Sequence, residues 1–252
     1  MRRRRRLYRR EAKKQEKVII GGLFTVLLCL TIGYSAFNTN INLSAKGNLK
    51  DKSRIIQSWG SNSNEDFHTD FYRKNIISAT FLDNAVVPSN AVEKWDVSES
   101  KDHGVMAYVI ESTSETGKYD LYIEAKGGVI ANANSSYLFD NFTEIKSISF
   151  DNNFDTSTDM SFMFHLCHSL TSLDVSNFDT KKVTNMEGMF CECRNLSILN
   201  LCSFDVSGVT NSVGMFKHMT NLNYVYVNDD FNIGVDYLFA NSNIFSVTKG
   251  MC

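Results

Sequence analysis

Cysteine and histidine recur at a fixed spacing in the second half of the chain, and these side chains are used by zinc sites and by redox sites. Cys167 and Cys193 are 26 residues apart, and His165 and Cys191 each come two residues before them. If neighbouring segments of the chain stack, the four side chains could meet, and zinc binds four such ligands in a tetrahedron. The two thiols at equivalent places could instead form a disulfide. The elements that carry these residues decide between the possibilities.

The second half of the chain repeats itself about every 26 residues. An apolar residue followed by Phe occurs five times, at intervals of 25, 26, 26 and 23 residues. The pairs are Leu138-Phe139, Met163-Phe164, Met189-Phe190, Met215-Phe216 and Leu238-Phe239. After each of the first four pairs comes the L-x-x-L-x-L pattern of leucine-rich repeats, which predicts one short parallel strand per coil. The segments are IKSISF (145–150), LTSLDV (170–175), LSILNL (196–201) and LNYVYV (222–227).

The repeat predicts a solenoid, because each coil has an apolar edge that it can bury only against the next coil. On the return side, Met160, Met163 and Phe164 have the i, i+3, i+4 spacing of one helical face, and we expect them to point inward. The predicted fold class is therefore α+β with repeats: a short leucine-rich-repeat solenoid of parallel strands over residues 132–252.

The same periodicity indicates where the four metal-type side chains lie. It places Cys167 and Cys193 inside the coils as packed thiols, and His165 and Cys191 partly outside. We favour packed thiols over a Cys167–Cys193 disulfide and over a zinc site, and we predict no metal and no cofactor. Cys191 is the one thiol for which the repeat supplies no structural reason.

Residues 67–131 are predicted to form a small β module that caps the first coil. Three segments rich in β-branched and aromatic residues predict strands, at 76–83, 104–112 and 119–127. The turn sequence TSETGK separates the last two, which predicts a hairpin. A short helix is expected near the start of the module.

The amino-terminal segments predict the location of the protein. Residues 1–17 carry seven Arg and three Lys against two Glu, and we expect a basic cytoplasmic tail. Residues 18–37 are 20 uncharged and mostly apolar residues, the length of a transmembrane helix. The basic flank orients it as a single-pass signal-anchor with the bulk of the chain extracytoplasmic; a cleaved signal peptide is the alternative. Residues 38–66 are polar and predict a tether.

The repeats LTSLDVSNFDTKKVTNMEGMFCECRN and LSILNLCSFDVSGVTNSVGMFKHMTN resemble the BspA-like leucine-rich repeat surface proteins of bacteria. The segments VEKWDVSES and YDLYIEAKGGVIANANSSYLF resemble the region before such repeats, and the likeness covers most of residues 18–245. It implies an extracytoplasmic, membrane- or wall-associated protein, with adhesion or binding as its function, and no catalytic residues to carry over. The chain departs from the pattern by ending at SVTKGMC after a shortened interval, so we expect no proper carboxyl-terminal cap.

The predicted function is binding at the cell surface. The chain has no G-x-S-x-G, no H-E-x-x-H and no phosphate-binding Gly loop, so we expect no enzyme and no catalytic residues. The partner is expected to be a protein or glycan, not nucleic acid, and the membrane is expected to be reached through residues 18–37. The alternative is a structural envelope scaffold that self-associates through its repeats.

Residues between the inward positions of the strands form the predicted binding face on the concave side. Exposed Tyr and Ile on a regular surface suit contact with a protein or a glycan. Ordinary solvated strand faces are the competing interpretation. The predicted binding residues are Ser172, Asp174, Ile198, Asn200, Tyr224 and Tyr226.

Overall fold

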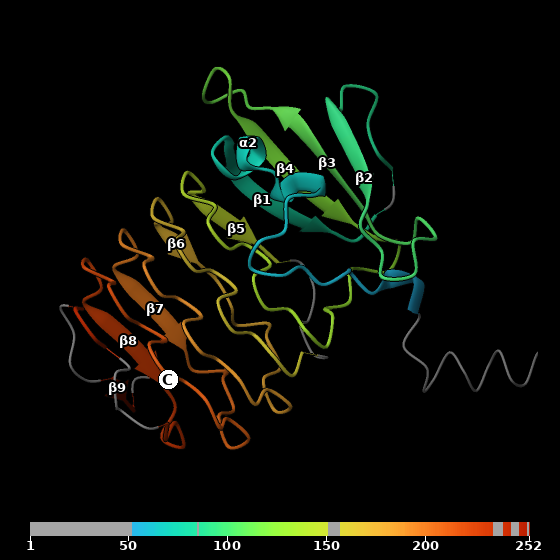
Figure 1. Cartoon of the computed structure of the whole chain (residues 1–252). Helices are drawn as coiled ribbons and strands as arrows, with labels where there is room; N and C mark the ends of the chain where they lie inside the picture. The colour runs from blue at the N-terminus through green and yellow to red at the C-terminus, as the bar shows by residue number, and fades with distance from the viewer. Residues whose placement is uncertain (1–51, 85, 151–156, 234–238, 243–246, 251) are drawn as a thin grey trace, which may run out of the picture. The chain divides into compact units, whose positions relative to one another are not determined.

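The computed structural model describes the second of two units into which the chain divides, residues 1–51 and Lys52–Cys252 (Figure 1). The described residues are 52–84, 86–150, 157–233, 239–242, 247–250 and 252. We call residues 52–131 the β module and residues 132–252 the coil stack. The predicted basic tail (1–17), membrane span (18–37) and first part of the tether lie outside the described residues.

The described chain is mostly β, which corrects the predicted fold class. Its helical elements are one α-helix of four residues, α2 (Asp70–Arg73), and two 3-10 helices of three residues, η1 (Lys52–Arg54) and η2 (Asp66–His68). None of the helices in the described ranges is long and apolar enough to cross a membrane. The described residues therefore give no support to the predicted transmembrane helix or to the single-pass membrane location, and both predictions rest on residues 18–37, which lie outside the described ranges.

Six strands form one mixed sheet that runs from the β module into the coil stack (Figure 1). They are β1 (Ile76–Leu82), β2 (Glu93–Asp96), β3 (Met106–Glu111), β4 (Tyr119–Glu124), β5 (Ser147–Ser149) and β6 (Ser172–Leu173). Their order is β2-β3-β4-β1-β5-β6. Strands β2, β3 and β4 pair antiparallel, whereas β4, β1, β5 and β6 pair parallel. The pairing of β1 with β5 makes the first coil a direct continuation of the module's sheet.

The three strands predicted in the module are confirmed, as is the β3–β4 hairpin. The module also includes residues that the sequence assigned to the tether. The Ile56 N–H donates to the Ile130 carbonyl at 3.0 Å, and the Gln57 N–H donates to the Val97 carbonyl at 2.8 Å. The side chains of Ile56 and Trp59 are buried. The chain is therefore part of the folded module from the start of the described residues, before position 66.

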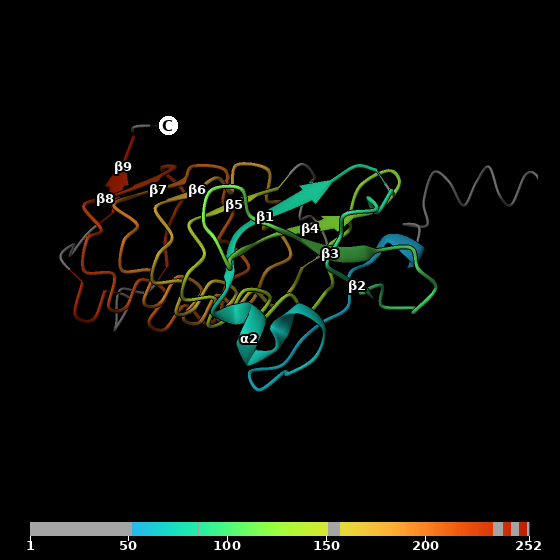
Figure 2. The ribbon, with the colours of Figure 1, turned by 90° about the horizontal axis from the view of Figure 1, so that it is seen from above.

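Parallel strands occur in all four predicted repeat segments. After β5 and β6, a second sheet contains β7 (Ile198–Leu201), β8 (Tyr224–Val227) and β9 (Thr248–Lys249) in that order, all parallel. In β7 the side chains alternate between exposed and buried, as one solvated strand face requires. Figure 2 shows the strands along one side of the stack and the returning segments along the other.

The returning segments do not form the predicted helical face. We call them the return wall, residues 134–141, 159–166, 185–192 and 211–218. Alternate backbone N–H groups of one coil donate to backbone carbonyls of the next coil. The pairs are Phe162 to Glu187, Phe164 to Met189 and Leu166 to Cys191, at 2.8–3.0 Å. Phe162 and Leu166 have φ of 55° and 60°. An α-helix is excluded because these residues are left-handed and their N–H groups bond between coils.

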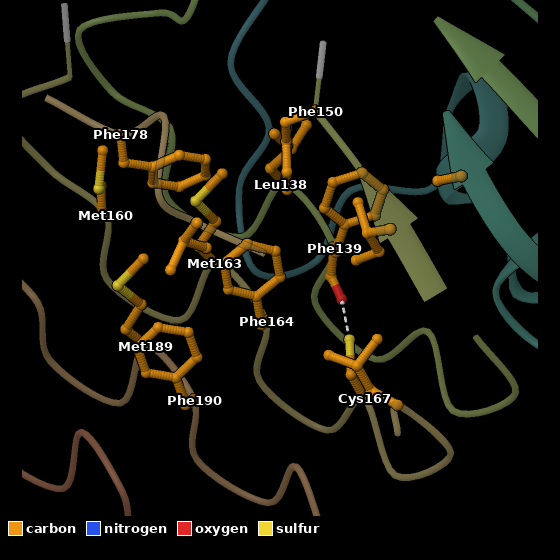
Figure 3. Packing of buried hydrophobic residues seen from close by; sticks show 14 of the residues in the cluster. Leu138, Phe139, Phe150, Met160, Met163, Phe164, Cys167, Phe178, Met189 and Phe190 are labelled. Carbon is orange, nitrogen blue, oxygen red and sulfur yellow. Dashed lines mark hydrogen bonds between the residues drawn. The ribbon is translucent and has the colours of Figure 1, made fainter. Parts of the chain in front are cut away.

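The inward direction of the predicted stripe is nevertheless confirmed, because Met160, Met163 and Phe164 are all fully buried. The Phe that follows the apolar residue in each coil stacks on its equivalent in the next coil. The ring centroids of Phe139 and Phe164 are 6.1 Å apart with an interplanar angle of 4°. Those of Phe164 and Phe190 are 5.6 Å apart with an interplanar angle of 7°. Figure 3 shows this column beside the Met side chains. The stack is therefore held by coil-to-coil hydrogen bonds outside and a phenylalanine column inside.

Candidate functional site

Four of the six predicted binding residues lie together on the exposed face of the second sheet. Ile198 of β7 pairs with Tyr224 of β8, and Asn200 pairs with Tyr226. Ile198 is 51% exposed and Tyr224 is 52% exposed. We call these four residues the β7–β8 face.

The other two predicted residues lie one coil away. Ser172 is in β6, and Asp174 follows the end of that strand; both are exposed. Strand β6 belongs to the first sheet and β7 to the second, so no strand pairing joins them. Asp174 Oδ1 accepts a hydrogen bond from the Ser176 N–H at 2.9 Å, and hydrogen bonding to Ser176 lowers the Asp174 pKa. The Asp174 carboxylate therefore stabilises the turn that follows β6.

The β7–β8 face is aromatic and carries no strong charge. The rings of Tyr224 and Tyr226 are nearly parallel, at 3°, with centroids 6.0 Å apart. Beside them Ile198 adds an aliphatic side chain, and Asn200 adds an amide whose oxygen accepts the Cys202 N–H at 3.0 Å. Such a surface can bury apolar area against a flat partner while the phenol groups supply hydrogen bonds at its edge.

A pocket of about 480 Å³ lies at the turns that follow β7 and β8, apart from the four face residues. Its lining is Ser203, Phe204, Asp205, Val206, Ser207, Asn228 and Asp230. A hydrogen bond from Ser207 lowers the pKa of Asp205. In the parts of the chain that the structure describes, no group of three or more His, Cys, Asp or Glu side chains is placed to hold a metal ion.

Cys167 and Cys193 are free, fully buried thiols, which confirms the packed-thiol interpretation and contradicts the disulfide between them. Cys167 Sγ donates to the Phe139 carbonyl at 3.2 Å (Figure 3), and Cys193 Sγ donates to the Phe164 carbonyl at 3.1 Å. Burial raises the pKa of both thiols above the usual range. Both side chains therefore act as core residues that satisfy one carbonyl of the preceding coil.

The sequence interpretation missed a disulfide between Cys202 and Cys252, whose Cα atoms are 5.7 Å apart. Cys202 comes directly after β7, and Cys252 comes shortly after β9, so both follow the carboxyl ends of parallel strands. Their separation of 50 residues is close to two repeat intervals. That spacing was the available signal, because equivalent positions in nearby coils lie at the same edge of the sheet.

The sequence interpretation also missed Asp140, which occupies in the first coil the position that His165 and Cys191 occupy in the next two. His165 Nδ1 lies 2.8 Å from Asp140 Oδ1, and the His165 side chain is 26% exposed. Burial lowers the pKa of His165, but hydrogen bonds with Asp140 and with Cys191 outweigh it and raise the pKa to about 9. The predicted partial exposure of His165 is confirmed, whereas Cys191 is buried, with 8% exposed.

Comparison with known proteins gives one family. A family model described as "Mycoplasma protein of unknown function, DUF285" matches residues 133–247. The matched segment is the coil stack, and the β module lies outside it. No curated protein and no solved structure matches the chain.

Proposed function

We propose that the chain is an interaction protein with BspA-like leucine-rich repeats, which binds a protein or glycan partner through the β7–β8 face. The observation that carries the proposal is the pairing of Ile198 with Tyr224. They are two of the six large apolar side chains that are exposed among the described residues, and they are direct neighbours across two strands. The proposed role is adhesion or recognition of the kind of partner displayed on cell surfaces.

The energetics favour this face as the centre of an interface. Covering an exposed Tyr or Ile contributes about 1.5–3 kcal/mol for each side chain. Tyr is among the residues that dominate binding energy in protein interfaces, and its ring loses little conformational entropy on binding. Two Tyr rings and one Ile on adjacent strands can therefore supply most of the affinity of a micromolar contact.

The shape of the face favours a macromolecule over a small molecule. Small-molecule ligands prefer concave pockets, and the pocket at Ser203–Ser207 does not include Ile198, Tyr224 or Tyr226. Two parallel phenol rings present their faces and edges to a flat surface. This arrangement suits stacking against a sugar ring or packing against apolar side chains of a protein.

The test is a binding screen with the full-length protein on a glycan array and on surface-protein extracts. The Ile198→Ala/Tyr224→Ala double variant is compared with Val213→Ala, which removes a 51% exposed apolar side chain from the return wall. The proposal predicts that a ligand of the wild type is lost by the double variant and kept by Val213→Ala. Equal retention by both variants would refute the β7–β8 face as the binding site.

Self-association through the repeats is a second candidate. It is favoured by the end of the second sheet, where β9 pairs with β8 on one side and no other described strand pairs with its second edge. An unpaired strand edge is a template for another chain. Sedimentation velocity of the full-length protein over a hundredfold concentration range separates the candidates. Reversible assembly that Lys249→Pro abolishes would support the scaffold, whereas a constant monomer would exclude it.

A further inference from the structure

One column of the return wall combines a carboxylate, an imidazole and a thiol. The position after the stacked Phe is Asp140 in the first coil, His165 in the second and Cys191 in the third. Asp140 Oδ1 is 2.8 Å from His165 Nδ1. The Leu166 N–H donates to the Cys191 carbonyl at 3.0 Å, which places Cys191 in the coil directly next to His165, and the Cys191 side chain contributes to the raised pKa of His165. Because Nδ1 contacts Asp140, a bond to the thiol would be made by the second ring nitrogen, Nε2.

This order of groups is the arrangement that activates a nucleophile. A protonated imidazole next to a cysteine stabilises its thiolate, and a third group holds the imidazole in the required orientation. The thiolate, not the thiol, is the reactive form of cysteine. The column sits on the wall opposite the strands, apart from the β7–β8 face.

We propose that Cys191 is a reactive thiol, activated by His165 and positioned through Asp140, that exchanges with small disulfide molecules. His165, as an imidazolium, stabilises the Cys191 thiolate, Asp140 holds His165 in place, and Cys191 forms the new bond. The product is a mixed disulfide on the return wall, a modification site on an otherwise structural repeat.

The backbone around Cys191 favours thiol exchange over acyl transfer. Acyl transfer needs free N–H donors to stabilise an oxyanion. The N–H groups of Cys191, Glu192 and Cys193 all donate to carbonyls, of Gly188, Lys217 and Phe190 respectively. Disulfide exchange needs no oxyanion hole, because the charge moves from one sulfur to another.

The other thiols of the coil stack indicate that the co-reactant comes from outside the protein. Cys193 is fully buried and donates to the Phe164 carbonyl, so it faces away from the surface. Cys202 and Cys252 are already joined to each other. A chain that contains a disulfide works where disulfides persist, so disulfide molecules are available there. The small exposed area of Cys191 favours a small reagent over a folded protein.

The step balances in atoms and electrons. The Cys191 thiol loses its proton to solvent, because His165 is already protonated at neutral pH, and the thiolate sulfur attacks one sulfur of the small disulfide. The S–S bond of the reagent breaks as a new S–S bond to Cys191 forms, and the other half leaves as a thiolate that accepts a proton. Cys191 is oxidised, and the released half of the reagent is reduced.

The charges around His165 agree with this role. With its pKa raised to about 9, the imidazole carries a proton at neutral pH and can stabilise a neighbouring thiolate as well as the Asp140 carboxylate. Arg73, which is buried, acts electrostatically on Asp140 from the β module. Lys217 occupies the same position in the next coil. The Phe162 ring also packs against the His165 ring, with centroids 5.5 Å apart and an interplanar angle of 74°.

The experiment measures the rate of mixed-disulfide formation at Cys191 in the full chain under non-reducing conditions. The probe is 2-hydroxyethyl disulfide, and the readout is mass spectrometry of the tryptic peptide 183–194, with fragmentation to separate Cys191 from Cys193. At pH 6.5 we expect Cys191 to react at least about fivefold faster in the native protein than in the urea-unfolded protein, because the column exists only in the native state. A native rate below the unfolded rate would overturn the proposal, since burial alone protects a thiol.

Variants separate activation from packing. His165→Gln should lower the native rate about tenfold or more, while His168→Gln, a half-buried histidine of the same coil, should leave it within about twofold. Between pH 6 and 8 the wild-type rate should change little, whereas that of His165→Gln should rise about tenfold per pH unit, as for an unassisted thiol. Equal pH profiles for the wild type and His165→Gln would contradict the proposal. The native-to-unfolded comparison on the wild type decides the matter if the variant fails to fold.

Discussion

Aromatic rings are buried differently in the coil stack and in the β module. In the stack, one Phe per coil lies parallel to its equivalent, as Phe164 does on Phe190 at 7°. In the module, Phe67 meets Trp59 at 56° and Trp95 at 61°, and these three rings come from separate segments. Each coil therefore depends mainly on its two neighbours, whereas each module residue depends on the whole module. Damage should stay local in the stack and spread through the module.

Two histidines show the same contrast in their charge. His68 of the module is fully buried, and burial lowers its pKa to about 3 although Nε2 contacts the Leu138 carbonyl at 2.9 Å. His165 of the stack has the Asp140 carboxylate as a partner, and its pKa is raised to about 9. The periodic wall places a charged partner beside the His165 ring, while the His68 ring packs against Trp59 and Phe67 of the module and Phe142 of the first coil.

The largest expected loss of stability comes from replacing one buried Phe by Ala in the coil stack and one in the β module. Phe190→Ala and Phe67→Ala should each lower the free energy of unfolding by about 3–5 kcal/mol, because a large fully buried side chain is replaced by a cavity. Urea denaturation of the full chain measures the loss. Hydrogen exchange should then differ: Phe190→Ala should speed exchange mainly in β7 and the adjoining return wall, and Phe67→Ala throughout β1 to β4.

If Phe190→Ala speeds hydrogen exchange in β3 and β4 as much as in β7, destabilisation in the stack is not confined to neighbouring coils, and the proposed difference between the two regions is wrong. Tyr224→Phe is the matched control, because it changes an exposed ring in the stack and should leave both exchange patterns unchanged.

Reduction of the Cys202–Cys252 disulfide should cost about 2–4 kcal/mol of stability, because the bond closes a loop of 50 residues in the unfolded chain. The stack is expected to lose protection first at β8 and β9, while the module keeps its exchange rates. Thermal unfolding of Cys202→Ser/Cys252→Ser beside the wild type gives the size of the effect. An unchanged melting temperature would show that the disulfide does not stabilise the last coils.

Gly188→Ala should cost about 1–3 kcal/mol. Gly188 has φ of 56°, and a Cβ there would come within 2.5 Å of the Phe162 ring of the previous coil. Gly214→Ala is the matched control at the equivalent position, with φ of 65° but its nearest contact, Lys217 Cβ, at 3.6 Å. The control should carry only the backbone cost of about 1 kcal/mol. Equal losses in both variants would show that Phe162 moves aside freely.

The two histidines should give opposite pH dependences of stability. His165 has a pKa of about 9 in the folded state and 6.5 in the unfolded state. The stability that it contributes is therefore fully present below pH 6.5 and is lost as the pH rises to 9. His68 has a folded pKa of about 3, so stability is lost as the pH falls from 6.5 towards 3. For His165 the change should be about 1–2 kcal/mol, reduced by the solvent that reaches this half-buried pair.

Unfolding free energies of the wild type, His165→Gln and His68→Gln between pH 4 and 9 test these directions. The difference between the wild type and His165→Gln should shrink above pH 6.5, and that between the wild type and His68→Gln should shrink below it. Parallel curves for the wild type and His165→Gln would mean that the Asp140 hydrogen bond does not change the proton affinity of His165.

The positions of the strands and of the buried side chains could be read from the repeat. The L-x-x-L-x-L pattern placed β5 to β8, and the 26-residue interval placed Cys167 and Cys193 inside. Both depend on a simple rule, that equivalent residues of stacked coils share one environment.

The conformation of the return wall could not be read from the repeat. The i, i+3, i+4 spacing of Met160, Met163 and Phe164 fits a helix, yet the same residues are buried in an extended wall whose N–H groups bond between coils. Left-handed backbone at Phe162 and Leu166 is not visible in residue identity, because such residues rarely adopt it. Glycine at the equivalent positions 188 and 214, both with positive φ, was the available signal.

The burial of hydrophobic residues inside a polar segment was also not predicted. Residues 55–59 contain Ile, Ile and Trp within a stretch whose Ser, Gly and Asn predict a tether. The structure buries Ile56 and Trp59 in the module, where the Ile56 N–H donates to the Ile130 carbonyl and the Gln57 N–H to the Val97 carbonyl. Such long-range pairing is not encoded in local composition. The exposure of Ile198, Asn200 and Tyr224 agrees with the prediction, because alternation along a strand decides which side chains are exposed. Their role in binding stays a prediction.

The most direct test of the proposed function is the dissociation constant of the partner, once captured, for the wild type, Tyr224→Ala and Val213→Ala. If the β7–β8 face is the centre of the interface, Tyr224→Ala should weaken binding about tenfold or more, and Val213→Ala should stay within about twofold of the wild type. A Tyr224→Ala protein that binds as tightly as the wild type, while Val213→Ala loses the partner, would contradict the account and move the binding site to the return wall.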